Sequence, residues 1–168
     1  MEDEEILDLV NASNKCVGTI KKTDSYNLAK TKLGFIRGAA VFIQNEAGEL
    51  WIPTRQMNLR VSPGGLDFSM AEHVSAGETT RQACVRGFKE ELFMDIAGAD
   101  LELLGTLPPS NEIYWFCDVF LYKANSVKDY SKDDFSSAEW IASEELIRRI
   151  ENDVLVKRSI LPALKAFF

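Results

Sequence analysis

The segment from Glu72 to Met94 constrains the fold of this chain more than any other stretch. Its second half, roughly Thr79 to Phe93, has the hydrophobic periodicity of one amphipathic helix. Threonine hydroxyls at the start of this helix can accept hydrogen bonds from its free backbone N–H groups. At about 100° per residue, one apolar face is formed by Cys84, Val85, Phe88 and Leu92. The segment therefore predicts a helix packed on the core of a globular domain.

The same helix carries two adjacent acids, Glu90 and Glu91, away from its apolar face. Ala83 and Gly87 lie beside them, and we expect these small residues to leave a gap next to the carboxylates. Arg86 precedes Glu90 by one helical turn, so the two side chains are close enough to pair. Two adjacent carboxylates on the open side of the helix, beside a gap, are candidates for a functional site. The alternative is that they are ordinary surface charges, which most exposed acids are.

Composition is that of an ordinary globular protein, with 46% hydrophobic and 27% charged residues. The 168 residues predict a single domain over 1–168, long enough to bury most of its apolar surface. A net charge of -7 disfavours binding to a nucleic acid polymer. No apolar run approaches the length of a membrane span, so we expect no membrane contact.

The cysteines and the acidic start of the chain indicate a cytoplasmic protein. Cys16, Cys84 and Cys117 are odd in number and far apart, which fits neither a zinc site nor a disulfide framework. The acidic residues 2–5 are the opposite of a signal peptide. The sequence does not determine the oligomeric state.

Strand and helix patterns alternate along the chain in a way that predicts an α+β sandwich with a mixed sheet. Residues 24–31 fit a short helix or a loop. Ser143 is expected to cap the helix that follows it. We expect strands at 6–10, 16–21, 35–44, 49–54, 66–70, 101–107, 113–124 and 138–142, and helices at 79–93, 144–152 and 155–168.

The spacing of Glu78, Arg86, Glu90 and Glu91 resembles the Nudix box, the signature of a family of hydrolases. The similarity covers roughly residues 4–146. It implies the Nudix fold, in which a mixed β-sheet lies between α-helices as an α/β/α sandwich. It also implies hydrolysis of a pyrophosphate bond in a nucleoside diphosphate derivative or a similar organic pyrophosphate, with Mg²⁺ or Mn²⁺ as cofactor.

Three positions depart from the family pattern. Glu72 replaces the first Gly, Gly87 replaces the Glu after Arg, and Phe93 replaces the last Gly. Because the family uses carboxylates at the positions of Gly87, Glu90 and Glu91, loss of the first is expected to weaken metal binding. Glu72, or an acid from a later loop, is a candidate to fill that space. Without Gly at 93 the helix cannot end on a left-handed glycine, so we expect it to run on towards residue 98.

The resemblance assigns further roles. Glu90 and Glu91 are the expected metal ligands, and Glu78 is expected to position Arg86 or to join the metal network. Glu112 and Asp134 follow the box in loops and are candidates for the general base or an accessory ligand. The candidates for contact with substrate are Arg55, Arg60 and Lys89 for phosphate, His73 for a hydrogen bond and Trp115 for stacking.

Two alternatives follow from the same residues. The loop sequences resemble the Nudix branch that includes isopentenyl diphosphate isomerase, and His73 fits the histidine of that branch. Ala71 stands where the isomerase needs a cysteine, and Trp115 stands where it needs a glutamate. Without these two proton-transfer groups we reject isomerase chemistry. The other alternative is a Nudix-fold protein that binds its ligand with little or no turnover because of Gly87.

Overall fold

A computed structural model describes residues 4–111 and 113–168. A small antiparallel hairpin forms from β1 (Ile6–Val10) and β2 (Cys16–Lys21). The main sheet has six strands in the order β6-β7-β3-β4-β8, and β5 pairs with β3 beside this path. Since β3 and β7 are parallel and the other pairs are antiparallel, the sheet is mixed. Its strands are β3 (Ile36–Gln44), β4 (Glu49–Arg55), β5 (Met70–His73), β6 (Glu102–Leu107), β7 (Trp115–Lys123) and β8 (Phe135–Ala142).

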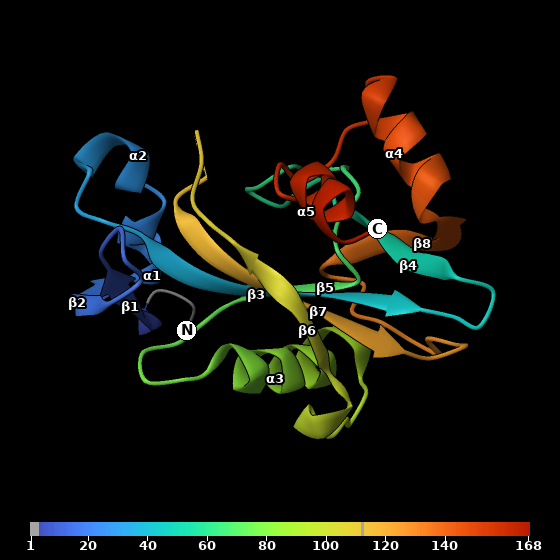
Figure 1. The fold of residues 1–168 in the computed structure, drawn as a ribbon, viewed down its shortest axis with the longest axis horizontal. Coiled ribbons are helices and arrows are strands. Elements are labelled where there is room, and N and C mark those ends of the chain that lie inside the picture. The colour runs from blue at the N-terminus through green and yellow to red at the C-terminus, as the bar shows by residue number, and fades with distance from the viewer. Residues whose placement is uncertain (1–3, 112) are drawn as a thin grey trace.

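Helices lie on both sides of this sheet. In Figure 1, α3 (Thr80–Leu92) lies on one side, and α4 (Ser143–Glu151) and α5 (Ile160–Phe167) lie on the other. Two short helices, α1 (Lys22–Ser25) and α2 (Leu28–Thr31), follow the hairpin, and a 3-10 turn spans Gly98–Asp100. This arrangement confirms the predicted α+β sandwich.

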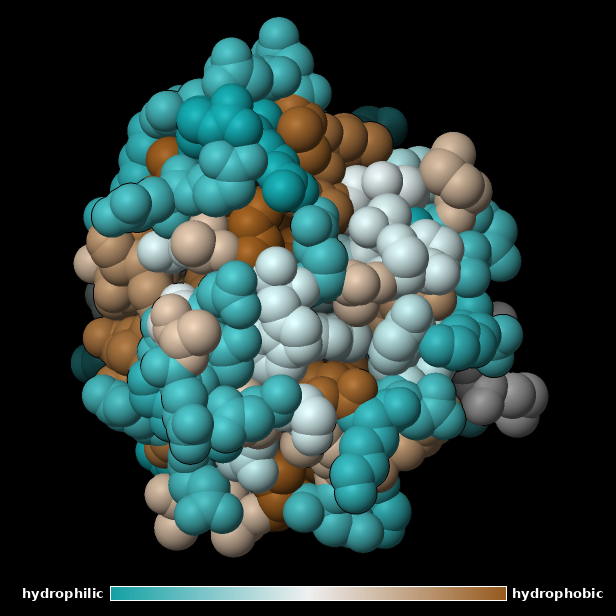
Figure 2. Space-filling view, turned by 90° about the vertical axis from the view of Figure 1, so that its right-hand side faces the viewer, coloured by the Kyte–Doolittle hydropathy of each residue, from teal (hydrophilic) through white to brown (hydrophobic). Residues whose placement is uncertain are grey.

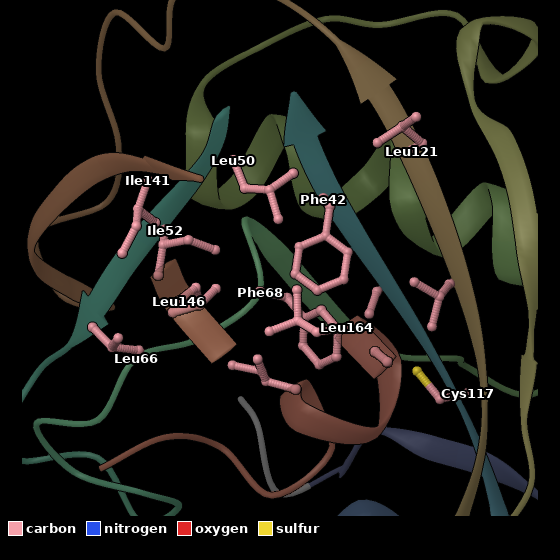
Figure 3. Close-up of a cluster of buried hydrophobic side chains, with 14 residues drawn as sticks. Phe42, Leu50, Ile52, Leu66, Phe68, Cys117, Leu121, Ile141, Leu146 and Leu164 are labelled. Carbon is pink, nitrogen blue, oxygen red and sulfur yellow. The ribbon is translucent and has the colours of Figure 1, made fainter. Parts of the chain in front are cut away.

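The core is divided by the alternation of side chains along β3. Ala39, Val41 and Ile43 pack with the residues under α3, whereas Ala40 and Phe42 pack with those under α4 and α5. Both layers are buried, which explains why the strand reads as a continuous apolar run. Figure 3 shows the second layer, with side chains from β3, β4, β7, β8, α4 and α5 gathered together.

The surface of the protein carries both hydrophilic and hydrophobic residues. Figure 2 shows the face on the right-hand side of Figure 1, where hydrophilic residues and residues of intermediate hydropathy surround smaller hydrophobic areas. In the part of the chain that the structure describes, no helix is long and apolar enough to span a membrane. Cys16 is exposed, Cys84 and Cys117 are buried, and all three are free thiols.

Several predicted bounds were wrong because long-range pairing overrides local pattern. The strand expected at 66–70 is β5 at Met70–His73, where it pairs with β3. Leu66 instead bridges Val156, and the backbone of residues 155 and 157 hydrogen-bonds to Leu66. The final helix therefore begins at Ile160 and not at residue 155.

Two predicted helix ends were also wrong. The helix α3 does not run on towards residue 98, because Phe93 itself adopts the left-handed conformation with φ 53° and closes it. The Met94 N–H then donates to the Phe88 carbonyl at 3.0 Å. Ser143 is the first helical residue of α4 rather than its cap, a position held by Ala142 without a side-chain hydrogen bond.

Candidate functional site

A cavity of about 800 Å³ opens between α3 and β5 on one side and the loop 56–65, the start of β7 and residues 157–159 on the other. Its size is in the usual range for a small-molecule site. Its wall combines opposite charges and aromatic rings. The acids are Glu5, Glu72, Glu90, Glu91 and Asp134, the cations are Lys22, Arg55, Arg60, Arg86, Lys157 and Arg158, and the rings include Tyr26, His73, Tyr114 and Trp115.

Arg86 connects the helix to the strand beside it. Its guanidinium makes two hydrogen bonds of 3.0 Å to the Glu78 carboxylate and one of 2.9 Å to the His73 carbonyl. It also lies 3.3 Å from Glu72 and 3.5 Å from Glu90. Two parallel bonds to one carboxylate fix the plane of a guanidinium. Glu78 therefore orients Arg86, and Arg86 keeps two further carboxylates at the cavity.

Glu91 is the most unusual acid of the site. It lines the cavity, yet its Oε2 atom is buried and has no hydrogen-bond partner among the described residues. Burial raises the pKa of its carboxyl well above the ordinary value, and the negative charges of Glu72, Asp67 and Asp134 raise it further, while Lys157 opposes the shift. A buried oxygen without a donor and with acids around it favours a bound cation.

The gap expected beside Gly87 is filled, so that expectation was wrong. Alternation along β5 turns Met70 and Glu72 towards α3, where Ala83 and Gly87 are buried. A Cβ atom at position 87 would lie 2.4 Å from Met70 Sδ and 2.7 Å from Glu72 Cγ. Glycine therefore lets the strand approach the helix closely, and the Glu72 side chain passes through the place that a side chain at 87 would take.

The acids fit a divalent ion. Among residues 4–111 and 113–168, no group of three or more His, Cys, Asp or Glu side chains is already arranged to hold a metal ion. Mg²⁺ does not require one, because it usually keeps waters and binds one or two carboxylates together with substrate phosphates. Such an ion prefers hard oxygen donors. The unpartnered oxygen of Glu91 is one, and the carboxylates of Glu72 and Glu90, both next to the Arg86 guanidinium, supply others.

Cations cover the opposite part of the wall. Lys157 Nζ lies 3.6 Å from Asp67 Oδ1 and 5.4 Å from the centre of the Trp115 ring. Arg55 donates to the Asp67 carboxylate at 2.5 Å and to the Val61 carbonyl at 2.7 Å. Arg55 thus braces the loop 56–65, and its predicted contact with phosphate stays a prediction.

His73 belongs to a group of rings in the wall. Its imidazole lies 6.1 Å from the rings of both Tyr26 and Trp115, and the guanidinium of Arg60 stacks 4.4 Å from the Tyr26 ring. Burial lowers the pKa of His73 to about 4, and the positive charges of Lys22 and Lys157 act in the same direction. The ring is therefore neutral at pH 7 and suited to stacking or to a neutral hydrogen bond.

The structure brings most of the predicted site residues to one cavity. Glu90, Glu91, Arg86, Arg55, Arg60, His73, Trp115 and Asp134 line it. Glu78 stands behind Arg86, and Lys89 faces a separate groove on the outer side of α3. Glu112 lies outside the described residues. Sequence reasoning missed Lys22, Tyr26 and Lys157, because nothing in their local pattern distinguishes them from surface residues.

Comparison with known proteins agrees with this geometry. The sequence model of the NUDIX domain matches residues 34–164. The chain belongs to the NUDIX domain family. An uncharacterized Nudix hydrolase of Nostoc sp. is 31% identical over 169 residues, covering 100% of this chain and 98% of the relative. The crystal structure of DR0079 from Deinococcus radiodurans has a TM-score of 0.86 at 29% identity, covering 98% of this chain and 99% of that one.

Membership of the Nudix family confirms the predicted fold and the predicted class of enzyme. A relative named isopentenyl-diphosphate Delta-isomerase, from Salmonella arizonae, is 27% identical over 157 residues and covers 88% of this chain and 82% of its own length. This is the branch that the loop sequences resemble. The Nudix match begins at residue 34, so the single domain over 1–168 stays a prediction.

Proposed function

We propose that this Nudix protein hydrolyses a pyrophosphate bond in a nucleoside diphosphate derivative or a similar organic pyrophosphate, with a divalent metal as cofactor. One observation carries the proposal. The buried Oε2 of Glu91 has no partner among the described residues and faces a cavity that also presents Lys157 and Arg60. A buried carboxylate oxygen without a donor and nearby cations that can hold phosphate are the two parts that a metal–diphosphate site needs.

Glu90 and Glu91 are the residues that would hold the metal. When bound, Mg²⁺ or Mn²⁺ neutralises phosphate oxygens and lowers the pKa of a coordinated water. Glu78 keeps Arg86 in place through its paired hydrogen bonds, and Arg86 in turn holds Glu90 at 3.5 Å. Glu78 and Arg86 therefore act as positioning residues for the proposed ligand Glu90.

The remaining chemistry is a displacement at phosphorus. The water oxygen forms a bond to one phosphorus, and the bond from that phosphorus to the bridging oxygen breaks. The water proton passes to a carboxylate, and the bridging oxygen leaves with the second phosphate. Asp134 lines the cavity and is the described candidate for this base, and Glu112 remains the second candidate. Lys157 and Arg60 line the same cavity, and their charges would offset that of the departing phosphate.

The aromatic wall supports a nucleoside as one half of the substrate. Tyr26, Tyr114 and Trp115 line the same cavity as the acids. A flat ring can stack on such side chains while the diphosphate reaches the charged part of the wall. The cavity of about 800 Å³ has room for a nucleotide-sized ligand.

The test is phosphate release from dinucleotides and nucleotide sugars with Mg²⁺ or Mn²⁺. We expect turnover by the natural chain and a loss of roughly 100-fold or more in kcat for Glu91→Gln, because the ligand oxygen loses its charge. Glu144→Gln is the matched control, since Glu144 is exposed in the first turn of α4. Equal rates for Glu91→Gln and the natural chain would contradict the proposal.

Binding without turnover is the second candidate, and it rested on a damaged site at Gly87. The close packing of Glu72 against Gly87 supports turnover instead, because it brings an acid next to the position that lacks one. A ligand that raises the melting temperature without metal, in a chain that hydrolyses nothing, would favour binding.

Isomerase chemistry lacks a reactive thiol. Cys117 is buried, burial raises its pKa to about 12, and none of the described cavity residues is a cysteine. A protonated, inaccessible thiol cannot exchange a proton with a substrate at neutral pH. The rejection of isomerase chemistry made from Ala71 and Trp115 therefore gains support from the cavity itself.

A further inference from the structure

We propose that Glu72 supplies, from strand β5, a third carboxylate to the divalent-metal site of Glu90 and Glu91, in the place that a side chain at position 87 would occupy. This inference rests on the proposed function and deepens it. It assigns a ligand that does not belong to the helix α3. It also explains how a chain with glycine at 87 retains a complete set of acids.

The geometry begins on α3. Positions 87, 90 and 91 are three and four residues apart, so side chains there share one face of the helix. Gly87 contributes no atoms to that face. The Glu72 Cγ atom lies 2.7 Å from the point where a Cβ of residue 87 would be. The side chain of Glu72, from strand β5, thus occupies the space that a side chain at position 87 would take.

The strand fixes the direction of that glutamate. β5 pairs with β3 through Ala39 and Ala40, opposite Glu72 and Ala71. The alternation of side chains then sends Glu72 towards α3 and Ala71 to the opposite face. The side chain of Glu72 is only 13% exposed, and it lines the same cavity as Glu91. Its direction is therefore set by the sheet and not by a flexible loop.

Negative charge is in excess beside α3. Three carboxylates, those of Glu72, Glu78 and Glu90, pair with one guanidinium, that of Arg86, and the negative charge of Glu72 also acts on the buried Glu91 carboxylate. Glu78 takes two of the hydrogen bonds that Arg86 donates. One oxygen of Glu91 has no donor among the described residues. A divalent cation between the three remaining acids would balance this excess of negative charge.

The first experiment measures metal binding directly, by titration of the natural chain and its variants with Mn²⁺ in a calorimeter and by electron paramagnetic resonance. We expect Glu72→Gln to weaken Mn²⁺ binding roughly tenfold or more, since glutamine keeps the shape but loses the charge. Glu144→Gln should bind as the natural chain does. Unchanged Mn²⁺ affinity in Glu72→Gln, or no Mn²⁺ binding by the natural chain, would overturn the inference.

The second experiment moves the carboxylate. Gly87→Glu alone should lower the melting temperature, because its Cβ meets Glu72 and lies 2.4 Å from Met70 Sδ. Glu72→Ala combined with Gly87→Glu should recover Mn²⁺ binding that Glu72→Ala loses. The same double variant is also made together with Met70→Ala, which removes the close contact between a Cβ at position 87 and Met70 Sδ. A folded combination that stays as weak as Glu72→Ala would overturn the equivalence of the two places.

Parallel assays separate this inference from the proposed function. If Glu72→Gln loses Mn²⁺ affinity while the natural chain cleaves no pyrophosphate, the ligand assignment stands and the proposed hydrolysis fails. If the natural chain is active and Glu72→Gln keeps both its Mn²⁺ affinity and its activity, the hydrolysis stands and this inference fails. Melting temperatures without metal show whether each variant is folded.

Discussion

Burial shifts the pKa values of Glu72 and His73, which are neighbours in the chain, in opposite directions. It raises the pKa of Glu72 to about 7 and lowers the pKa of His73 to about 4. In both cases the low-dielectric surroundings disfavour the charged form. The strand β5 therefore carries an acid that gains from a cation and a ring that stays neutral.

We expect His73 to titrate near pH 4 in the folded, metal-free protein. Its folded pKa is lower than the ordinary 6.5, so the unfolded chain takes up the proton first as the pH falls. The stability that His73 contributes is full above pH 6.5 and is lost as the pH falls towards 4. Because the sequence contains one histidine, its ring signal in proton NMR is unambiguous.

The control for this prediction is His73→Phe, which keeps a ring between Tyr26 and Trp115. Its urea midpoint should fall less than that of the natural chain between pH 6.5 and 4. A ring signal with a midpoint near 6.5 would show that the imidazole is solvated and would contradict the buried position.

The helix α3 begins and ends through different interactions. Its start is a capping box in which Thr79 and Gln82 exchange hydrogen bonds of 3.1 and 2.9 Å. The threonines predicted this start correctly, since capping is a local interaction. Its end uses Phe93 in the left-handed region, which costs an L-residue with a side chain about 1–2 kcal/mol.

We expect Phe93→Gly to stabilise the protein. Glycine adopts the conformation at φ 53° without strain, and Phe93 is 59% exposed, so little packing is lost. Glycine also raises the conformational entropy of the unfolded chain, which offsets part of the relieved strain. The net gain in the free energy of unfolding should therefore be about 0.5–1 kcal/mol. Urea denaturation measures it.

Phe93→Ala serves as the comparison for that change. It removes the ring but keeps the Cβ atom and therefore the backbone strain. A gain in Phe93→Ala equal to that in Phe93→Gly would attribute the effect to the exposed ring and would contradict the strain argument.

At the scale of the whole molecule, the C-terminal segment completes a cavity that begins near the N-terminus. Residues 155–157 pair with Leu66, which places Lys157 beside Asp67 and Trp115. Lys22 from α1 and Glu91 from α3 line the same cavity. Sequence positions from one end of the fold to the other therefore meet at one site.

We expect Lys157→Met to raise KM for a pyrophosphate substrate roughly tenfold or more, because one charge-assisted contact to phosphate is lost. Methionine keeps an apolar stem over Trp115 but removes the charge beside the buried Asp67 carboxylate, so the melting temperature is expected to fall and is measured beside KM. Steady-state kinetics on whichever dinucleotide or nucleotide sugar is cleaved measures the effect.

Lys165→Met is the matched control for Lys157→Met, since Lys165 pairs with Glu151 away from the cavity at 2.8 Å. It should leave KM unchanged. An equal rise in both variants would point to a general effect of net charge and not to phosphate contact at Lys157.

The strands β1 and β2, the helix α3 and the pairing of Arg86 with Glu90 could be predicted from the amino-acid sequence, because they depend on alternation, capping and spacing within a short stretch. The expected place of Glu78 beside Arg86 came from the resemblance to the Nudix box. The sequence left open whether Glu72 or a later acid fills the place beside Gly87, and it did not indicate that Lys157 lines the cavity; the folded chain shows both placements. Both placements depend on strand pairing between distant segments, and a single sequence carries no local signal for such pairing.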